Sequence, residues 1–254
     1  MSEKEMSVYD HIGELRKRVI LVAVVFLVTT VAGLFFAEPI IRYLQQADRA
    51  KDLTMNAFRL TDPIKIYFQF SFVIGCVLTA PLALYQLWAF ISPGLYERER
   101  KVTLGYIPLS LFLFLAGVAF SYFVLLPYVL NFSASLAENL NVTQVIGINE
   151  YFDFLIKLTL PFGLLFQLPV IIMFLTRLGI VTPTFLSKFR RYAYFILLVL
   201  AGIISPPDVI SQIIVMIPLV ILYEISIIIS RSAHKKVLEA RQLEEMQEEQ
   251  EKAL

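Results

Sequence analysis

A carboxylate set among cations near the N-terminus is the first group that could do binding chemistry. Residues 7–18 read SVYDHIGELRKR and place Glu14 four positions before Arg18. Apolar residues recur at helical spacing through the same segment, which predicts an amphipathic helix leading into the apolar run that follows: Val8, Ile12, Leu15 and Val19. On this helix Glu14 either pairs with Arg18, for about a few tenths of a kcal/mol, or faces a ligand.

A second group of candidates follows the second apolar run. Residues 88–101 read WAFISPGLYERERK, with aromatic residues first, then Pro93 and Gly94, then alternating charges that include Glu99. Aromatic residues followed by charge are typical of a membrane boundary, and Pro-Gly forces a turn.

The third group is polar and lies between two apolar runs. Residues 205–212 read SPPDVISQ, and Glu224 follows in the same apolar run as Gln212. Asp208 is placed to cap the helix that begins after the prolines. Polar groups in apolar surroundings usually face a bundle interior or a partner, which is the prediction for Gln212 and Glu224.

The patterns of common enzymes are missing from the sequence. There is no HExxH, GxSxG or Walker loop and no plausible intramembrane aspartate pair. The single cysteine, Cys76, cannot form an intrachain disulfide or a paired cysteine ligand set. We therefore expect a protein that is not an enzyme and needs no metal or cofactor.

The composition indicates an integral membrane protein. The 254 residues are 58% hydrophobic and 17% charged, with a mean hydropathy of +0.72, whereas soluble domains carry about 25% charge. Long runs contain no Asp, Glu, Lys or Arg, and a bilayer core needs about 20 such residues in a helix. These runs are residues 19–37, 66–96, 102–137, 158–176, 192–207 and 209–223.

We predict an all-α integral membrane protein with six transmembrane helices. The expected spans are residues 19–37, 66–90, 103–127, 154–176, 192–204 and 209–229. They form a single transmembrane domain over residues 1–230, which includes the amphipathic N-terminal helix. Residues 231–254 are expected to be a charged cytoplasmic tail, either a solvated helix or a disordered end.

The distribution of positive charge predicts that both termini are cytoplasmic. Lys and Arg are retained on the inner side, and with the N-terminus inside, most of the 22 fall there. The other side holds Arg42, Arg49, Lys51, Arg59, Lys65 and Lys157. The loop of residues 38–65, which carries most of these, is the weakest part of the assignment.

The fifth and sixth helices are expected to be short. Residues 192–204 rise roughly 20 Å as a helix, against about 30 Å of hydrocarbon core. One interpretation is that the hairpin of the fifth and sixth helices thins the bilayer, recruits flanking residues or is shielded by a partner. The other is that the fifth helix starts earlier and that the Arg191 and Tyr192 side chains extend to the interface. Prolines within or at the ends of spans predict a kinked bundle with a concave face: Pro81, Pro108, Pro161, Pro169 and Pro218.

Taken together, the segments HIGELRKR, WAFISPGLYERERK and ISPPDVISQ resemble the three signature regions of the TatC family, in that family's order and spacing. The resemblance covers essentially the whole chain. It implies the core subunit of twin-arginine protein translocation in the cell inner (cytoplasmic) membrane. Such a subunit binds the signal peptides of folded cargo and scaffolds TatA-type subunits for transport driven by the proton-motive force.

The resemblance also implies roles for individual residues. Glu14 and Glu99 would read the arginine pair of the signal, supported by Leu15, Arg16 and Phe90. Ser205 and Gln212 would contact single-span TatA or TatB subunits, and the active complex would be a homo-oligomer in the lipid bilayer, with no nucleic acid involved. Many members carry Glu in the fourth span where this chain has Gln167, so a proton-responsive carboxylate at that position is not expected here.

A polytopic small-solute secondary transporter is the alternative. That class predicts a charged or polar site at the bilayer midplane and often repeated halves. Few ionisable residues lie deep in any predicted span, which favours the translocase.

Overall fold

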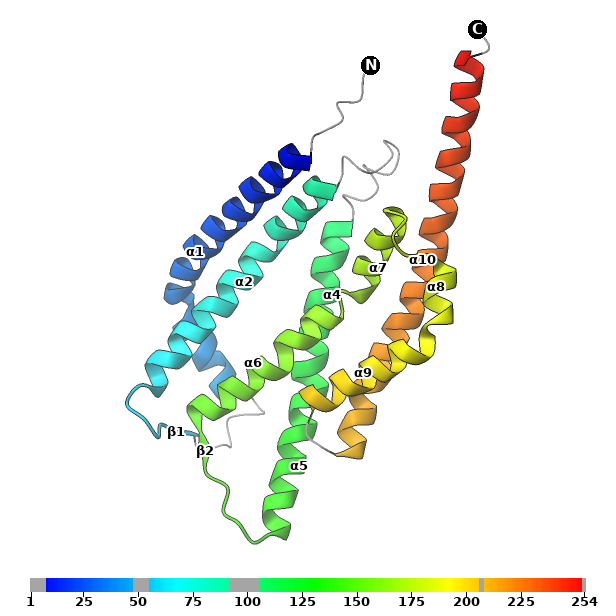
Figure 1. Ribbon diagram of the computed structural model, residues 1–254. Coiled ribbons are helices and arrows are strands. Elements are labelled where there is room, and N and C mark those ends of the chain that lie inside the picture. The colour runs from blue at the N-terminus through cyan, green and yellow to red at the C-terminus, as the bar shows by residue number, and fades with distance from the viewer. Residues whose placement is uncertain (1–7, 48–54, 92–105, 206–207, 253–254) are drawn as a thin grey trace. The chain divides into compact units, whose positions relative to one another are not determined.

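A computed structural model describes residues 8–47, 55–91, 106–205 and 208–252 of the chain (Figure 1). Its elements in chain order are α1 (Val8–Gln46), β1 (Met55–Asn56), α2 (Asp62–Ile91), α4 (Tyr106–Phe120), the π-helix η2 (Ser121–Leu125), α5 (Leu126–Asn139), β2 (Ile146–Gly147), α6 (Ile148–Leu165), α7 (Leu168–Arg177), α8 (Pro183–Lys188), α9 (Arg190–Ile204) and α10 (Val209–Lys252).

Long apolar helices dominate these ranges, which confirms the all-α membrane class. Five helical stretches in the described residues are long and apolar enough to cross a bilayer: Ile12–Gln46, Asp62–Phe90, Ile107–Asn139, Ile148–Arg177 and Val209–Glu239. The predicted fifth span corresponds to α9, whose 15 residues rise only about 22 Å. It begins at Arg190, as the interpretation with an earlier helix start expected. Six crossings therefore remain a prediction.

The outer faces of these helices are apolar, as a bilayer requires. Along α1, Leu27, Val28 and Phe35 are 63%, 63% and 81% exposed. In water a surface of this kind would drive aggregation, whereas lipid tails solvate it.

The chain divides into two compact units. The first contains α1, α2, the start of α4 up to Leu111, and Val145–Asp153. The second contains Phe112–Gln144 and the chain from Phe154 onward.

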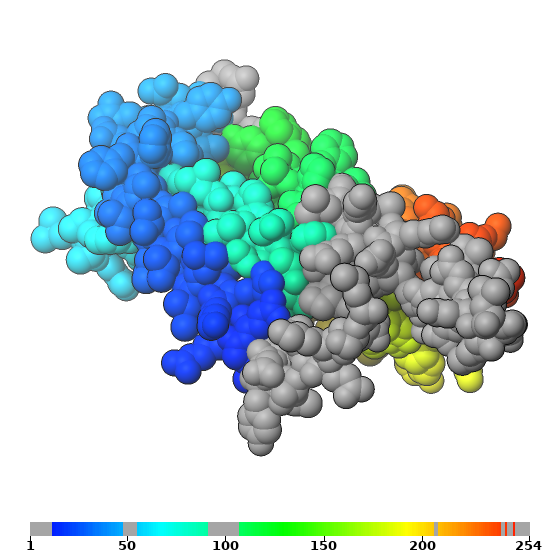
Figure 2. Space-filling view, turned by 90° about the horizontal axis from the view of Figure 1, so that it is seen from above, coloured from blue at the N-terminus to red at the C-terminus, as the bar shows by residue number. Residues whose placement is uncertain are grey.

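In the first unit, α1 and α2 pack as an antiparallel hairpin through small residues. In Figure 2, α1 (blue) lies against α2 (cyan). A Cβ on Gly75 would overlap the Thr30 hydroxyl, and one on Gly33 would lie 2.8 Å from the Ser71 carbonyl oxygen. The hydroxyls of Thr29 and Thr79 lie 2.8 Å apart. Close backbone approach with hydroxyl bridges is how membrane helices associate without a hydrophobic driving force.

The first part of α2 and the segment before it are bonded to β2 and to α6. The buried Asp62 carboxylate accepts backbone N–H groups of Phe58 (3.1 Å) and Arg59 (2.9 Å), which fixes the chain entering α2. Strands β1 and β2 pair in parallel, and the Gln69 amide donates to the Asp153 carboxylate at 3.0 Å.

In the second unit, the third predicted span continues well past Pro127. Pro127 has no backbone N–H, and the ladder widens just before it, where the Leu126 N–H donates to the Ser121 carbonyl five residues back. Pro127 then occupies the first turn of α5, where its missing donor is tolerated. The helix continues as α5 to Asn139 and so extends past the expected membrane boundary near residue 127, which stays a prediction.

The fourth predicted span is two helices rather than one. α6 ends at Leu165 and α7 begins at Leu168, with Gln167 at the N-cap and Pro169 in the first turn of α7. Because Pro169 cannot donate to the preceding turn, the helix is interrupted directly before it. Gln167, the residue that stands in place of the family's Glu, thus lies at the break.

The last helix is longer than expected. α10 contains 44 residues from Val209 to Lys252, so the prediction of a short sixth helix is wrong. The tail was expected to be either a solvated helix or a disordered end. Over residues 231–252, which the structure describes, it is helical. Buried hydroxyls of Thr176 on α7 and Ser230 on α10 are 2.7 Å apart and join these two helices.

Candidate functional site

Glu14 lies near the start of α1, at the end of the hairpin where α2 finishes. Its Oε1 accepts two hydrogen bonds from Arg18, and the one from Nε is 3.0 Å long. The Nη1 of Arg18 also donates to the Gln86 side-chain oxygen of α2 at 2.8 Å. The Glu14 and Arg18 side chains are 28% and 24% exposed. The i,i+4 ion pair considered from the sequence is therefore present, and Gln86 extends it across the hairpin.

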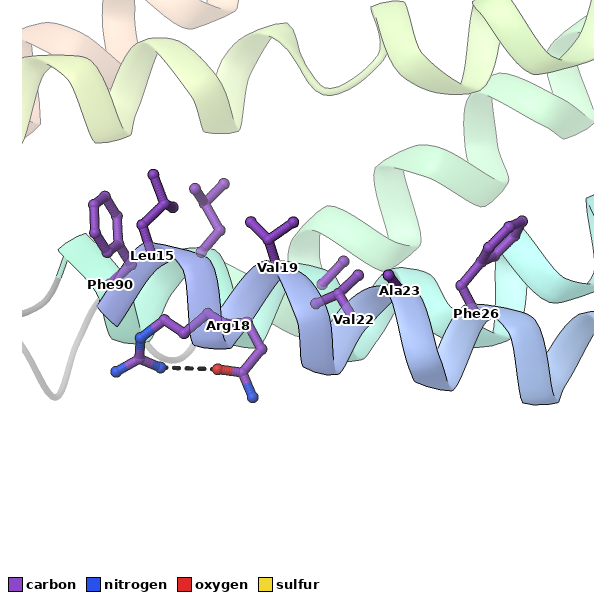
Figure 3. Close-up of a pocket in the computed structure, with 10 residues that line it drawn as sticks. Leu15, Arg18, Val19, Val22, Ala23, Phe26 and Phe90 are labelled. Carbon is purple, nitrogen blue, oxygen red and sulfur yellow. Dashed lines mark hydrogen bonds between the residues drawn. The ribbon is translucent and has the colours of Figure 1, made fainter. Parts of the chain in front are cut away.

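An apolar hollow of about 380 Å³ lies beside this pair. Its lining comes from both helices of the hairpin: Leu15, Arg18, Val19, Val22, Ala23, Phe26, Ala83, Gln86, Leu87 and Phe90. Figure 3 shows Leu15, Val19 and Phe90 pointing to one side and the guanidinium of Arg18 to the other. The hollow can take an apolar side chain or segment close to a partly buried carboxylate.

The structure places three of the five predicted signal-binding residues at one end of the hairpin. Leu15 and Phe90 line the hollow, and Glu14 is bonded to Arg18, which also lines it. Arg16 is exposed and is not part of the hollow. Glu99 lies outside the described residues.

Sequence reasoning missed most of the hollow. Of the lining residues Val19, Val22, Phe26, Ala83 and Leu87, the amphipathic stripe predicted from the sequence includes only Val19. The spacing of Leu15, Val19, Val22 and Phe26 is a helical signal that could have found the α1 wall. The contact of Arg18 with Gln86 joins residues far apart in sequence, so no local pattern reveals it.

The predicted partner-binding residues lie at the hairpin of α9 and α10. Ser205 ends α9 and is buried, and its N–H donates to the Ala201 carbonyl at 2.9 Å. Gln212 is half-buried, and its amide donates to the Leu198 carbonyl of α9 at 3.4 Å. In this structure Gln212 thus bonds α9, its own neighbour.

Asp208 is the N-cap of α10. Its carboxylate accepts the Ser211 backbone N–H at 2.8 Å, the Ser211 hydroxyl, and the Tyr128 hydroxyl at 3.3 Å. Burial alone raises the pKa of Asp208, but these hydrogen bonds outweigh it and lower the pKa below its ordinary value.

Glu224 is paired rather than free within its apolar helix. It accepts from the Arg190 guanidinium at 2.8 Å and from the Tyr194 hydroxyl at 2.5 Å. Both donors come from α9, so the pair and the Gln212 bond hold α9 to α10. Among the described residues, no group of His, Cys, Asp and Glu could hold a metal ion.

Comparison with known proteins gives one consistent result. The sequence profile described as "Sec-independent protein translocase protein (TatC)" matches residues 10–218. The Sec-independent protein translocase protein TatCy of Bacillus subtilis (strain 168) is 62% identical over 236 residues, covering 93% of each chain. TatC of Halalkalibacterium halodurans is 53% identical over 250 residues, covering 98% of each.

A solved structure agrees with these relatives. The crystal structure titled "Twin Arginine Translocase Receptor- TatC" is similar with a TM-score of 0.75 and 33% identity, covering 88% of this chain and 99% of that one. The profile covers residues 10–218, and these relatives and the solved structure cover 88% or more of the chain. The chain belongs to the TatC family of Sec-independent protein translocase proteins.

Proposed function

We propose that this chain is the signal-reading subunit of a twin-arginine translocase, and that it grips the signal with the α1–α2 hairpin. The observation that carries the proposal is the partly buried Glu14 carboxylate beside the apolar hollow that Leu15 and Phe90 line. A signal that presents arginines next to apolar residues matches both features at once.

The chemistry of Glu14 suits a guanidinium. A planar guanidinium offers paired donors to a carboxylate, and lysine lacks this fork. Arg18 already makes such a contact with Glu14. An arginine pair needs two carboxylates, and Glu99, which follows α2 in the sequence, is the proposed second one.

The helices α9 and α10 are the proposed docking surface for single-span TatA- or TatB-type subunits. Ser205 and Gln212 lie where these helices meet. A partner's polar group would compete for the Gln212 amide, whose bond to Leu198 is long at 3.4 Å. In a membrane such an interhelical hydrogen bond contributes about 0.6–2 kcal/mol. Several copies of the chain would assemble in the active complex.

The proposed topology has six crossings in the cytoplasmic membrane with both termini inside. In the first unit, the basic residues 16–18 and the end of α2 lie together, as Arg18 and Gln86 show. In the second unit, Asp208 and Ser230 are separated by roughly 33 Å of helix, close to the thickness of a bilayer core. Each unit by itself supports this arrangement.

Transport energy would come from the proton-motive force, as the resemblance to TatC proteins implies. The sequence has no Walker loop that would bind a nucleotide instead. Membership of the TatC family favours the translocase over the small-solute transporter. The chain would act by binding and scaffolding, without a catalytic step.

The test is peptide binding to the chain in lipid nanodiscs. The probes are a peptide with two consecutive arginines before an apolar segment and the same peptide with two lysines. We expect Glu14→Gln to weaken binding of the arginine peptide by about tenfold or more, since a charge-assisted bond contributes about 1.5–3 kcal/mol.

The matched control is Glu38→Gln. Glu38 forms an i,i+4 pair with Arg42 near the other end of α1, so the same charge is removed from the same helix. We expect unchanged binding. Equal affinity of Glu14→Gln and wild type for the arginine peptide would remove the proposal.

A further inference from the structure

The carboxylate that a signal arginine would need is already occupied by an arginine of the same chain. Arg18 donates to Glu14 through Nε and Nη2, and both bonds go to Oε1. Its third bond, from Nη1, goes to Gln86 at 2.8 Å. One guanidinium is thus divided between a carboxylate on its own helix and an amide on the facing helix.

We propose that Arg18 is a built-in competitor for the signal-binding carboxylate and thereby lowers the affinity with which arginine-bearing signals bind. This inference rests on the proposed function and adds a residue to it that the family resemblance did not assign. In the free protein Arg18 takes the place of the incoming guanidinium on Glu14. A signal binds by displacing it or by sharing the carboxylate with it.

The bond from Arg18 to Gln86 lowers the cost of replacing Arg18 on Glu14 by a signal arginine. If Arg18 left Glu14 with no other partner, a cation that is 24% exposed would lose all its hydrogen bonds at once, which is costly. The bond to Gln86 remains when Glu14 changes partner, and Figure 3 marks it as a dashed line. Arg18 can therefore stay on α2 while Glu14 turns to the ligand.

The competitor lowers the affinity of Glu14 for arginine and for lysine by the same factor, because only the fraction of protein with a free Glu14 carboxylate binds a ligand. The preference for arginine comes from the forked guanidinium of the ligand, which the compact ammonium of lysine lacks. Arg18 thus sets how tightly cationic signals bind, and Glu14 sets the preference for arginine.

The experiment compares Arg18→Gln with Lys17→Gln in the full chain in nanodiscs, using the arginine and lysine peptides. Lys17 is exposed and forms no ion pair among the described residues, so its variant removes the same charge without touching Glu14. We expect Arg18→Gln to bind the arginine peptide about 2- to 10-fold more tightly. The lysine peptide should gain by the same factor, because removing the competitor frees Glu14 for every ligand alike, while Lys17→Gln should leave both affinities near the wild-type values.

A second variant tests the role of Gln86 without removing Arg18. Gln86→Glu offers Arg18 a carboxylate on α2 and should draw it away from Glu14, which tightens peptide binding. If the gain acts through Arg18, it disappears when Gln86→Glu is added to Arg18→Gln. A gain of equal size in that double variant would mean that the new carboxylate itself attracts the peptide, and the competitor would be refuted.

Failure of this inference differs from failure of the proposed function. If Arg18 only positions Glu14, Arg18→Gln weakens binding of both peptides and the competitor is refuted, whereas Glu14→Gln still abolishes discrimination. If Glu14→Gln binds like wild type, the proposed function itself is refuted. Arg18→Gln and Lys17→Gln with identical affinities for both peptides would also overturn the inference.

Discussion

At the residue scale, hydrogen bonds hold three carboxylates of the described residues in position. Glu14 points to Arg18, Glu224 to Arg190 and Tyr194, and Asp208 to Ser211. A carboxylate near lipid is costly unless it is paired. These partners therefore fix the position of each carboxylate before any ligand arrives.

The cap of α10 gives a prediction at this scale. Asp208→Ala should lower the free energy of unfolding at neutral pH by about 0.5–2 kcal/mol, because the Ser211 N–H loses its acceptor. The pKa of Asp208 is lowered in the folded protein, so its contribution is present above the unfolded value of about 3.9 and is lost as the pH falls through the folded value. Thermal unfolding in mild detergent at a series of pH values measures this.

The control for this prediction is Asp208→Asn. Asparagine keeps the capping acceptor without the charge, so it should cost less than alanine and should show no titration. A difference between wild type and Asp208→Ala that stays constant down to about pH 3 would contradict the prediction.

At the element scale, the two helices that carry the proposed site are held at close distance by small residues. Gly75 leaves room for Thr30, and Gly33 leaves room for Ser71. The hollow is lined from both helices, so its shape depends on this distance. Packing far from the hollow thus determines what fits into it.

Gly75→Val should therefore separate α1 from α2. Its side chain would overlap the Thr30 hydroxyl, and overpacking of this kind costs about 1–3 kcal/mol. We expect a lower melting temperature together with weaker binding of the arginine peptide. Gly13→Ala on α1 is the matched control, because nothing lies within 4 Å of the added carbon, and it should leave both quantities at the wild-type level or slightly raise stability.

The contact of α7 with α10 gives another prediction at this scale. The hydroxyls of Thr176 and Ser230 are buried and 2.7 Å apart. A double-mutant cycle with Thr176→Val and Ser230→Ala should give a coupling of about 0.6–1.7 kcal/mol. Additive effects of the two changes would show that the bond contributes nothing.

Much of this element level could be predicted from the sequence, and the exceptions have physical causes. Charge-free runs located the spans because lipid excludes charge, and spacing located the Glu14–Arg18 pair because helical neighbours are four residues apart. The π-helix before Pro127 and the break before Pro169 were missed, since a proline in an apolar run does not say how the backbone accommodates it. Gln86 and the partners of Glu224 depend on contacts between helices, which no local pattern encodes.

At the scale of the whole molecule, the positions of basic residues within each unit bear on its orientation in the membrane. The bond from Arg18 to Gln86 brings residues 16–18 to the end of α2. In the second unit, Arg177 and Arg231 follow directly after Thr176 and Ser230, which are bonded to each other. In the second unit, these basic residues thus lie together at one end of α7 and the facing part of α10, as retention of positive charge predicts. In the first unit, Arg42, Arg59 and Lys65 lie toward the other end of the hairpin.

Cysteine labelling tests this orientation. In a Cys76→Ala background, Lys235→Cys should react with a membrane-impermeant reagent only after the cells are opened, because residue 235 is predicted to be cytoplasmic. Asn141→Cys should react in intact cells, because residue 141 follows α5 and is predicted to lie on the outer side of the membrane. Any barrier outside that membrane must be permeable to the reagent. Labelling of both positions from the same side would contradict the six-crossing topology.

The length of α10 also determines how far the chain reaches from the membrane. Its 44 residues extend about 66 Å, roughly twice the thickness of the hydrocarbon core. Beyond Ser230 the helix continues for about 33 Å, several times the Debye length of about 8 Å at physiological salt. In the proposed topology, the far end of this helix therefore lies beyond the range of the lipid headgroup charge and extends into the aqueous phase, where soluble molecules can reach it.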